Sequence, residues 1–369
     1  MTEPFLSSFL PQPGHKRLAL ALALLVCLAS AMAPVAPARA EPGAQAARVA
    51  TAQVAAQRLA ARNEALARAN AAVVGVDAVA IEDASSVATL GRSRQGSGVV
   101  IGSDGLVLTI GYLILEADHV DLVLDNGRRV PARVVAYDVA SGLGLLQGLA
   151  PLALAPAPLG ASAAVRGDEP LLVASGGDEG DLSVARMVSR RAFSGYWEYH
   201  IEGALFTAPA RFDHSGAGLF NANGELVGIG SLVVADASGG SVAPAERGNM
   251  FVPVDLLKPV LASLHAGRAP HLTTRAWLGL NCVEIGGHVR VVRLAAESPA
   301  EDAGLQPGDL ILAIDGTPVN DLASMYRTLW RDERAEREVS IDVARGGELM
   351  RLNARAVDRM KTLSRPRGV

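Results

Sequence analysis

Aromatic residues are scarce in this chain of 369 residues: Phe, Trp and Tyr together make up 4% of the sequence. Gly and Pro, which break helices and form turns, number 38 and 20. This balance favours many short strands joined by turns over a helical bundle. Apolar residues make up 50% of the chain, which is enough to bury one or two sizeable cores.

Cysteine is nearly absent, and Cys27 and Cys282 are the only two. We expect the segment that holds Cys27 to be removed, so the mature chain would form no internal disulfide. Cys282 is then best explained as a small apolar side chain of a core. No group of His, Cys or acidic residues has the spacing of metal ligands, so the sequence predicts neither a metal site nor a cofactor.

An excess of positive charge is also lacking. The whole chain has a net charge of −4, and residues 1–40 hold three basic residues and one acidic residue, so their removal leaves −6. Proteins that bind nucleic acid usually present a basic surface. The charge balance therefore argues against nucleic acid as a partner.

Only one long apolar run is present, residues 18–33, and it lies near the N-terminus. Lys16 and Arg17 precede this run, and Ala38-Arg39-Ala40 follows it with the small-x-small pattern of a cleavage site. The run is short for a membrane span. We predict that residues 1–40 form a signal peptide, cleaved after Ala40, that exports the protein. An uncleaved membrane anchor is the alternative.

The remaining chain changes character several times. An Ala-rich stretch after Pro42-Gly43 carries small apolar residues at alternating three- and four-residue spacing, which predicts a helix with a weak apolar seam. Short β runs follow, separated by turns such as Asp104-Gly105 and Asn126-Gly127. The expected units are a helix over 41–72, a β-rich domain over 73–262, a linker over 263–275, a second domain over 276–358 and a flexible tail over 359–369.

Four motifs follow one another along the β-rich domain: Gln95–Ile101, Asp125–Arg128, Asn221–Ile229 and Phe251–Val254. Together they resemble the HtrA family of periplasmic trypsin-like proteases over most of residues 73–260. The resemblance implies a mainly β fold with a chymotrypsin-like double β-barrel, and a periplasmic location. It also implies assembly through the N-terminal segment, so a homo-oligomer is one expected state.

The catalytic residues of that family are mostly replaced. Its histidine falls at Tyr112 and its aspartate at Gly142, and only its serine is kept, as Ser215. Peptide hydrolysis on this scaffold uses all three, because the serine attacks, the histidine takes its proton and the aspartate orients the imidazole. Asp213 also replaces a glycine whose amide helps to bind the oxyanion, and its charge would oppose that of the transition state.

Residual activity would need another base. Tyr112 is a poor one, because a phenol has a pKa near 10 and only about one in a thousand is ionised at neutral pH. His214 is adjacent to Ser215, but neighbouring side chains generally point apart. We therefore expect Ser215 to be a remnant nucleophile, and a Ser215–His214 pair is the alternative. His119 and His200 are expected to be ordinary surface or core residues.

The last domain has its own motifs. Ser298–Leu305, Pro307–Ile311 and the loop Trp277-Leu278-Gly279-Leu280 resemble an α+β PDZ domain of the HtrA type. The resemblance implies that a peptide adds as a strand to a sheet edge while the loop amides bind its terminal carboxylate. Gly279 permits this close approach. Four residues would line the pocket for the last side chain, although core packing explains each equally well: Leu280, Leu322, Met325 and Leu329.

These interpretations together predict an HtrA-like pseudoprotease. It would bind peptide C-termini or unfolded polypeptides through its PDZ domain, as an adaptor or chaperone in envelope protein quality control. Two alternatives remain: a weak or conditional serine endopeptidase that uses Ser215, and a non-catalytic partner subunit of an active HtrA-type protease. Loss of cleavage in Ser215→Ala would favour the first alternative, and co-purification with a protease would favour the second.

Overall fold

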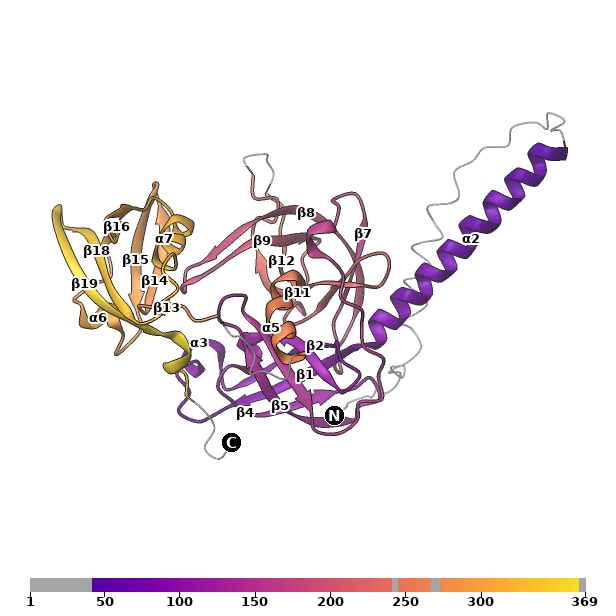
Figure 1. Ribbon diagram of the computed structural model, residues 1–369, viewed down its shortest axis with the longest axis horizontal. Coiled ribbons are helices and arrows are strands. Elements are labelled where there is room, and N and C mark those ends of the chain that lie inside the picture. The colour runs from indigo at the N-terminus through magenta and orange to yellow at the C-terminus, as the bar shows by residue number, and fades with distance from the viewer. Residues whose placement is uncertain (1–41, 241–244, 266–272, 365–369) are drawn as a thin grey trace, which may run out of the picture.

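Figure 1 shows the computed structural model, which describes residues 42–240, 245–265 and 273–364. A long N-terminal helix projects from two central β-barrels, and a smaller unit of strands and short helices lies on the opposite side. The predicted signal peptide, residues 1–40, lies outside the described residues. Within the described ranges, no helix is both long and apolar enough to cross a membrane.

The projecting helix, α2 (Pro42–Ala71), has little apolar surface to bury. Its C-terminal end meets the body, where Ala69 is buried and Leu66 packs against the barrel core. Val54 and Leu59, which lie further out, are exposed. In the single chain, tertiary packing therefore stabilises only the last turns of this helix.

The first barrel is a closed sheet in the order β1-β2-β3-β6-β5-β4. Its strands are β1 (Val73–Ala80), β2 (Ser93–Val100), β3 (Leu106–Ile110), β4 (Ala117–Val123), β5 (Arg129–Tyr137) and β6 (Leu143–Gly148). The expected turn at Asp104-Gly105 joins β2 to β3, and Gly105 has a φ of 87°, which suits a residue without a side chain. Two short helices accompany the barrel: α3 (Val87–Leu90) and α4 (Gly111–Ile114).

The second barrel is closed in the order β10-β11-β12-β9-β8-β7. Its strands are β7 (Pro170–Ala174), β8 (Leu182–Gly195), β9 (Tyr199–Ala208), β10 (Gly218–Phe220), β11 (Leu226–Val234) and β12 (Gly248–Pro253). The short helices are η2 (Ser162–Ala164), η3 (Val254–Leu257) and α5 (Lys258–His265). One hydrophobic cluster holds residues of both barrels, including Leu108 and Phe206, so the barrels share a core.

The C-terminal unit is a sheet in the order β13-β19-β18-β16-β15-β14, with β17 paired to β16. Its elements are β13 (Ala276–Trp277), β14 (Leu280–Ile285), β15 (His288–Leu294), α6 (Pro299–Asp302), β16 (Leu310–Ile314), β17 (Thr317–Pro318), α7 (Leu322–Leu329), β18 (Arg337–Arg345) and β19 (Glu348–Asp358). This unit has its own hydrophobic core, which includes Cys282 as expected. Two barrels followed by an α+β unit confirm the predicted fold class.

The structure describes the first part of the tail that was expected to be flexible, residues 359–364 of 359–369. It contains η4 (Arg359–Lys361), and the Ser364 amide donates to Glu116 of the first barrel at 2.9 Å. The Glu116 carboxylate also accepts from the Ser86 amide at 2.8 Å. A buried acceptor on the barrel therefore contacts this part of the tail.

Candidate functional site

Ser215 lies in the loop between β9 and β10, half-buried where the two barrels meet. Its carbonyl accepts the Ser97 amide at 2.8 Å, which ties the loop to β2 of the first barrel. The next residue, Gly216, has a φ of 75° and its amide donates to Gly230 at 2.9 Å. A Cβ at Gly216 would collide with the Ser97 carbonyl, so this sharp turn requires glycine.

The Tyr112 side chain reaches Ser215 from α4. Its phenol hydroxyl lies 2.8 Å from Ser215 Oγ and 2.9 Å from the Ser231 carbonyl. Its single hydrogen can be donated to only one of them at a time, and the Ser215 hydroxyl can donate to the phenol oxygen in return. Removal from solvent raises the pKa of Tyr112 to about 12, although the hydrogen bond with Ser215 acts in the opposite direction. At pH 7 only about one Tyr112 in 10⁵ would then be ionised. The group beside the serine therefore keeps its proton at neutral pH.

The turn that carries Tyr112 is held by Arg94, which the sequence analysis did not single out. Arg94 Nη1 donates to the Tyr112 carbonyl at 3.0 Å and to the Leu115 carbonyl at 2.6 Å, and Nη2 donates to Ser86 Oγ at 2.8 Å. A buried guanidinium with these partners fixes the backbone within α4 and at its C-terminal end. Arg94 lies in the expected β run of residues 93–100, where nothing in the local pattern marks it as buried.

Gly142 lies in the turn between β5 and β6 with a φ of 73°. Its carbonyl accepts the Gly111 amide at 2.7 Å, which places it beside α4. A Cβ at Gly142 would lie 3.1 Å from the ring of Tyr199, and the Tyr199 hydroxyl donates to the Ser141 carbonyl at 2.6 Å. The Tyr199 side chain therefore crowds the space into which an aspartate at this position would extend.

Asp213 is part of a polar cluster two residues before Ser215. Arg211 Nε donates to its carboxylate at 2.9 Å, and both Arg211 Nη2 and Ser175 Oγ make further short hydrogen bonds to it. Burial favours the neutral acid, but the hydrogen bonds from Arg211 and Ser175 outweigh it and hold the pKa of Asp213 below its usual value. The carboxylate of Asp213 is therefore ionised and paired with the Arg211 guanidinium.

The three histidines considered from the sequence have other partners. His214 Nδ1 lies 3.1 Å from the Phe212 carbonyl, His119 Nε2 lies 3.3 Å from Asp121, and His200 Nδ1 lies 2.8 Å from Ser194 Oγ. Partial burial lowers the pKa of His214. Among the hydrogen bonds of the described residues, Ser215 Oγ has no histidine partner. The same residues contain no cluster suited to a metal ion.

The predicted carboxylate-binding loop contacts a carboxylate from the chain itself. The amides of Leu278, Gly279 and Leu280 donate to Glu198 at 2.9, 2.8 and 3.1 Å. Burial raises the pKa of Glu198 to about 7, and the three loop amides act in the opposite direction. Trp277, the first residue of the predicted loop, lies beside it, with the guanidinium of Arg359 4.6 Å from its ring centre.

The other predicted pocket residues lie together on α7. Leu322, Met325 and Leu329 are buried in the same cluster as Leu278 and Leu280. In this structure they act as core residues, which was one of the two readings of the sequence.

Tyr326, also on α7, was missed although it contacts the same hairpin as the loop. Its hydroxyl donates to the Gly195 carbonyl at 2.8 Å and accepts from the Glu198 amide at 3.1 Å. The aromatic stretch around residues 196–199 was the signal that could have indicated this contact.

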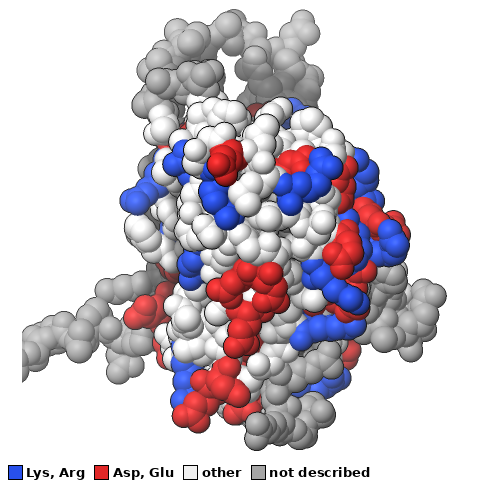
Figure 2. Space-filling model, turned by 90° about the vertical axis from the view of Figure 1, so that its left-hand side faces the viewer, with Lys and Arg blue, Asp and Glu red and all other residues white. Residues whose placement is uncertain are grey.

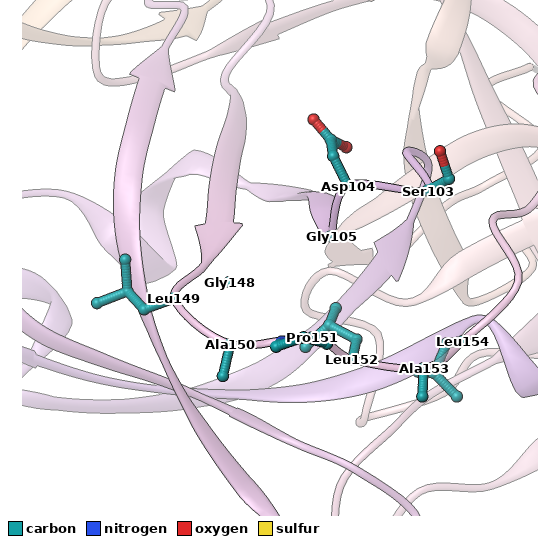
Figure 3. Close-up of a pocket in the computed structure, with 10 residues that line it drawn as sticks. All are labelled: Ser103, Asp104, Gly105, Gly148, Leu149, Ala150, Pro151, Leu152, Ala153 and Leu154. Carbon is teal, nitrogen blue, oxygen red and sulfur yellow. The ribbon is translucent and has the colours of Figure 1, made fainter.

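One hollow lies apart from both sites (Figure 3). It has a volume of about 450 Å³ and is lined by residues 103–105 and 148–154. Asp104 is the only ionisable side chain among them. This hollow therefore lacks the groups that a catalytic centre would need.

The surface of the C-terminal unit carries charges of both signs, and Figure 2 shows a central column of acidic residues with basic residues beside it. Ion pairs within the unit include Arg345–Asp309 at 2.7 Å and Arg351–Asp342 at 2.6 Å.

Two family models match the chain in order. Residues 96–229 match the trypsin-like peptidase domain and residues 276–355 match the PDZ domain. A protein from Ectopseudomonas mendocina named "Probable periplasmic serine endoprotease DegP-like" is 28% identical over 275 residues, which cover 69% of this chain and 56% of that protein. The serine protease PepD from Mycobacterium tuberculosis is 26% identical over 254 residues, which cover 63% of this chain and 54% of that protein. The chain spans about half the length of these two relatives.

Solved structures give the same result for the fold. The HtrA-type protease AlgW with a tripeptide has a TM-score of 0.50 and 24% identity, covering 83% of this chain and 99% of that chain. The same protease with a decapeptide has a TM-score of 0.50 and 21% identity, covering 81% of this chain and 98% of that chain. The chain therefore consists of a trypsin-like peptidase domain followed by a PDZ domain, and it is homologous to the HtrA/DegP serine proteases.

Proposed function

We propose that this protein is a non-proteolytic homologue of the HtrA proteases. It is exported to the periplasm and binds peptide C-termini or unfolded segments through its PDZ domain. There it serves as an adaptor or chaperone in envelope protein quality control. The proposal covers two separate properties, the loss of hydrolysis and the retention of peptide binding.

The contact between the Tyr112 and Ser215 hydroxyls carries the first property. Hydrolysis requires a base that removes the serine proton, whereas a phenol with a pKa of about 12 keeps its own proton at neutral pH. In an enzyme of related chemistry, loss of the base alone lowers kcat about a millionfold. Gly142 offers no carboxylate to orient a base.

The loop from Leu278 to Leu280 supports the second property. Its three amides already hold a carboxylate, which is the task of a PDZ loop toward a peptide C-terminus. The solved AlgW structures that share this fold contain a tripeptide and a decapeptide. The periplasmic location rests on the predicted signal peptide and on the names of relatives such as the E. mendocina protein.

Degradation of casein by the purified protein tests the first property. We expect no cleavage by the parent protein or by Ser215→Ala, with an active HtrA-type protease as the positive control. Cleavage by the parent that disappears in Ser215→Ala would contradict the proposal and indicate a conditional endopeptidase. Suppression of casein aggregation, measured by light scattering, checks the chaperone role separately.

A further inference from the structure

The hairpin formed by β8 and β9 is long, and its tip reaches the PDZ domain (Figure 1). Strand β8 alone runs from Leu182 to Gly195, and α7 contacts both strands of the hairpin. The tip consists of Tyr196, Trp197 and Glu198, between the paired residues Gly195 and Tyr199. The tip contacts the three parts of the PDZ domain that are expected to bind a peptide: the loop at residues 278–280, strand β14 and α7.

The Glu198 carboxylate accepts hydrogen bonds from all three loop amides at the same time. Oε1 accepts from Leu278, and Oε2 accepts from both Gly279 and Leu280. Glu198 is only 9% exposed, so these bonds lie away from bulk water. A peptide C-terminus would need the same donors, and each amide has only one hydrogen to give. The loop cannot bind a peptide carboxylate and Glu198 together.

The hairpin backbone also occupies the open edge of the PDZ sheet. Strand β14 is the last strand of that sheet, and its Cys282 amide donates to the Tyr196 carbonyl at 2.9 Å. A bound peptide would use this edge by adding as a further strand. On the other side of the groove, Tyr326 of α7 holds the Gly195 carbonyl at 2.8 Å. The tip is therefore held between β14 and α7 as well as by its carboxylate.

The backbone conformation of Glu198 indicates that its contact with the loop amides outweighs the residue preference of the turn. The loop of three residues between Gly195 and Tyr199 ends at Glu198, which has a φ of 56°. Hairpin loops of this length favour a left-handed residue at their last position, where glycine is most easily accommodated. A glutamate there is disfavoured by the backbone. Glycine, which the turn alone would favour, has no side chain that could reach the loop amides.

We propose that the tip of the β8–β9 hairpin is an internal ligand of the PDZ groove, with the Glu198 carboxylate in the place of a peptide C-terminus. A peptide with a free α-carboxylate binds by displacing this tip. The inference rests on the proposed peptide-binding function and adds its regulation. The internal ligand is tethered to the groove, so it competes with every external peptide. The apparent affinity of a peptide is its affinity for the open groove multiplied by the fraction of molecules in which the groove is open.

The test uses a fluorescent heptapeptide, Ala-Phe-Ser-Gly-Tyr-Trp-Val, which copies residues 192–197 and ends in a free α-carboxylate. The same peptide with a C-terminal amide is the ligand control. Binding by fluorescence polarisation is compared for the parent, Glu198→Gly and Glu198→Gln. Glu198→Gly suits the turn, so it removes the carboxylate without disturbing the hairpin. Glu179→Gln, an exposed carboxylate in the turn between β7 and β8, is the protein control.

We expect Glu198→Gly to bind the free-acid peptide at least tenfold more tightly than the parent. Glu198→Gln should show a smaller gain, because its amide oxygen can still accept from the loop. Glu179→Gln should match the parent, and the amidated peptide should bind none of the proteins. Equal affinity in the parent and Glu198→Gly would overturn the internal ligand while leaving peptide binding intact. If no variant binds the peptide or a pooled library of free C-termini, both the inference and the peptide-binding function are wrong.

Discussion

The hydroxyl of Tyr112 keeps its proton at neutral pH, so it supplies no base to Ser215. It lies within hydrogen-bond distance of Ser215 Oγ and the Ser231 carbonyl, and its single hydrogen serves one of them while the phenol oxygen can accept from Ser215. These contacts join α4 of the first barrel to the β9–β10 loop and β11 of the second. A structural role of this side chain can be tested by stability as well as by activity.

Removal of that hydroxyl in Tyr112→Phe should lower the free energy of unfolding by about 1 kcal/mol, because the Ser215 hydroxyl and the Ser231 carbonyl lose a partly buried hydrogen-bond partner. Urea denaturation followed by circular dichroism measures the difference. Casein degradation should stay absent in this variant. An unchanged midpoint in urea would mean that water replaces the hydroxyl without loss of stability, and that the contact does not stabilise the fold.

The substitution Gly142→Asp should destabilise the protein by more than the cost of placing a non-glycine residue in the left-handed backbone conformation. Gly142 and Gly127 have φ values of 73° and 75°, but a Cβ at Gly127 meets nothing within 4 Å. Gly127→Asp is thus the matched control for the left-handed backbone. We expect Gly142→Asp to cost about 2 kcal/mol more, because its side chain must displace the Tyr199 ring. Equal thermal midpoints for the two variants would show that the site still accommodates a carboxylate.

At the scale of elements, the β8–β9 hairpin should respond to pH through Glu198. Burial raises the pKa of Glu198 to about 7 when the hairpin tip is docked, against 4.5 for a free side chain. The docked state therefore binds more protons, and docking weakens as the pH rises from about 4.5 to 7. The charged or titratable groups near Glu198 are Arg359, Tyr326 and Cys282, and the latter two stay neutral in this range.

The distance between spin labels at Leu149→Cys and Leu349→Cys measures this docking. Both positions are exposed, one on the first barrel and one on the PDZ domain, whereas Cys282 is buried. We expect a broader and longer distance distribution at pH 8 than at pH 5. In Glu198→Gln the distribution should not depend on pH. A pH response that persists in Glu198→Gln would assign the titration to another group.

The sequence revealed the elements better than the contacts between them. Turn residues such as Asp104-Gly105 and the motif order indicated two barrels and a PDZ domain, because those signals are local. The approach of Glu198 to the loop at residues 278–280 joins positions about 80 residues apart, and no local pattern encodes it. The same holds for Tyr199 beside Gly142, where only the fold shows what replaced the missing side chain.

At the scale of the whole molecule, the barrels and the PDZ domain have separate hydrophobic cores. Polar contacts connect the two parts. They include those of Glu198, the Cys282 amide and the Tyr326 hydroxyl at the hairpin tip, the bond from Ser364 to Glu116, and an exposed pair between Arg327 and Glu202 at 2.8 Å. An exposed ion pair of this kind contributes about 0–1 kcal/mol. Most of the coupling between the parts should therefore depend on the buried contacts of the hairpin tip.

Calorimetry of the parent and Glu198→Gly tests this coupling. Loss of the carboxylate removes three charge-assisted hydrogen bonds but also the cost of burying the charge, so we expect a net loss of about 2 kcal/mol. For a domain of this size that lowers the PDZ transition by roughly 10 °C. The barrel transition should stay or rise, because glycine suits the turn at position 198. A parallel fall of both transitions would instead mean that the two parts unfold as one cooperative unit, and that the hairpin tip is part of a continuous structure rather than a releasable ligand.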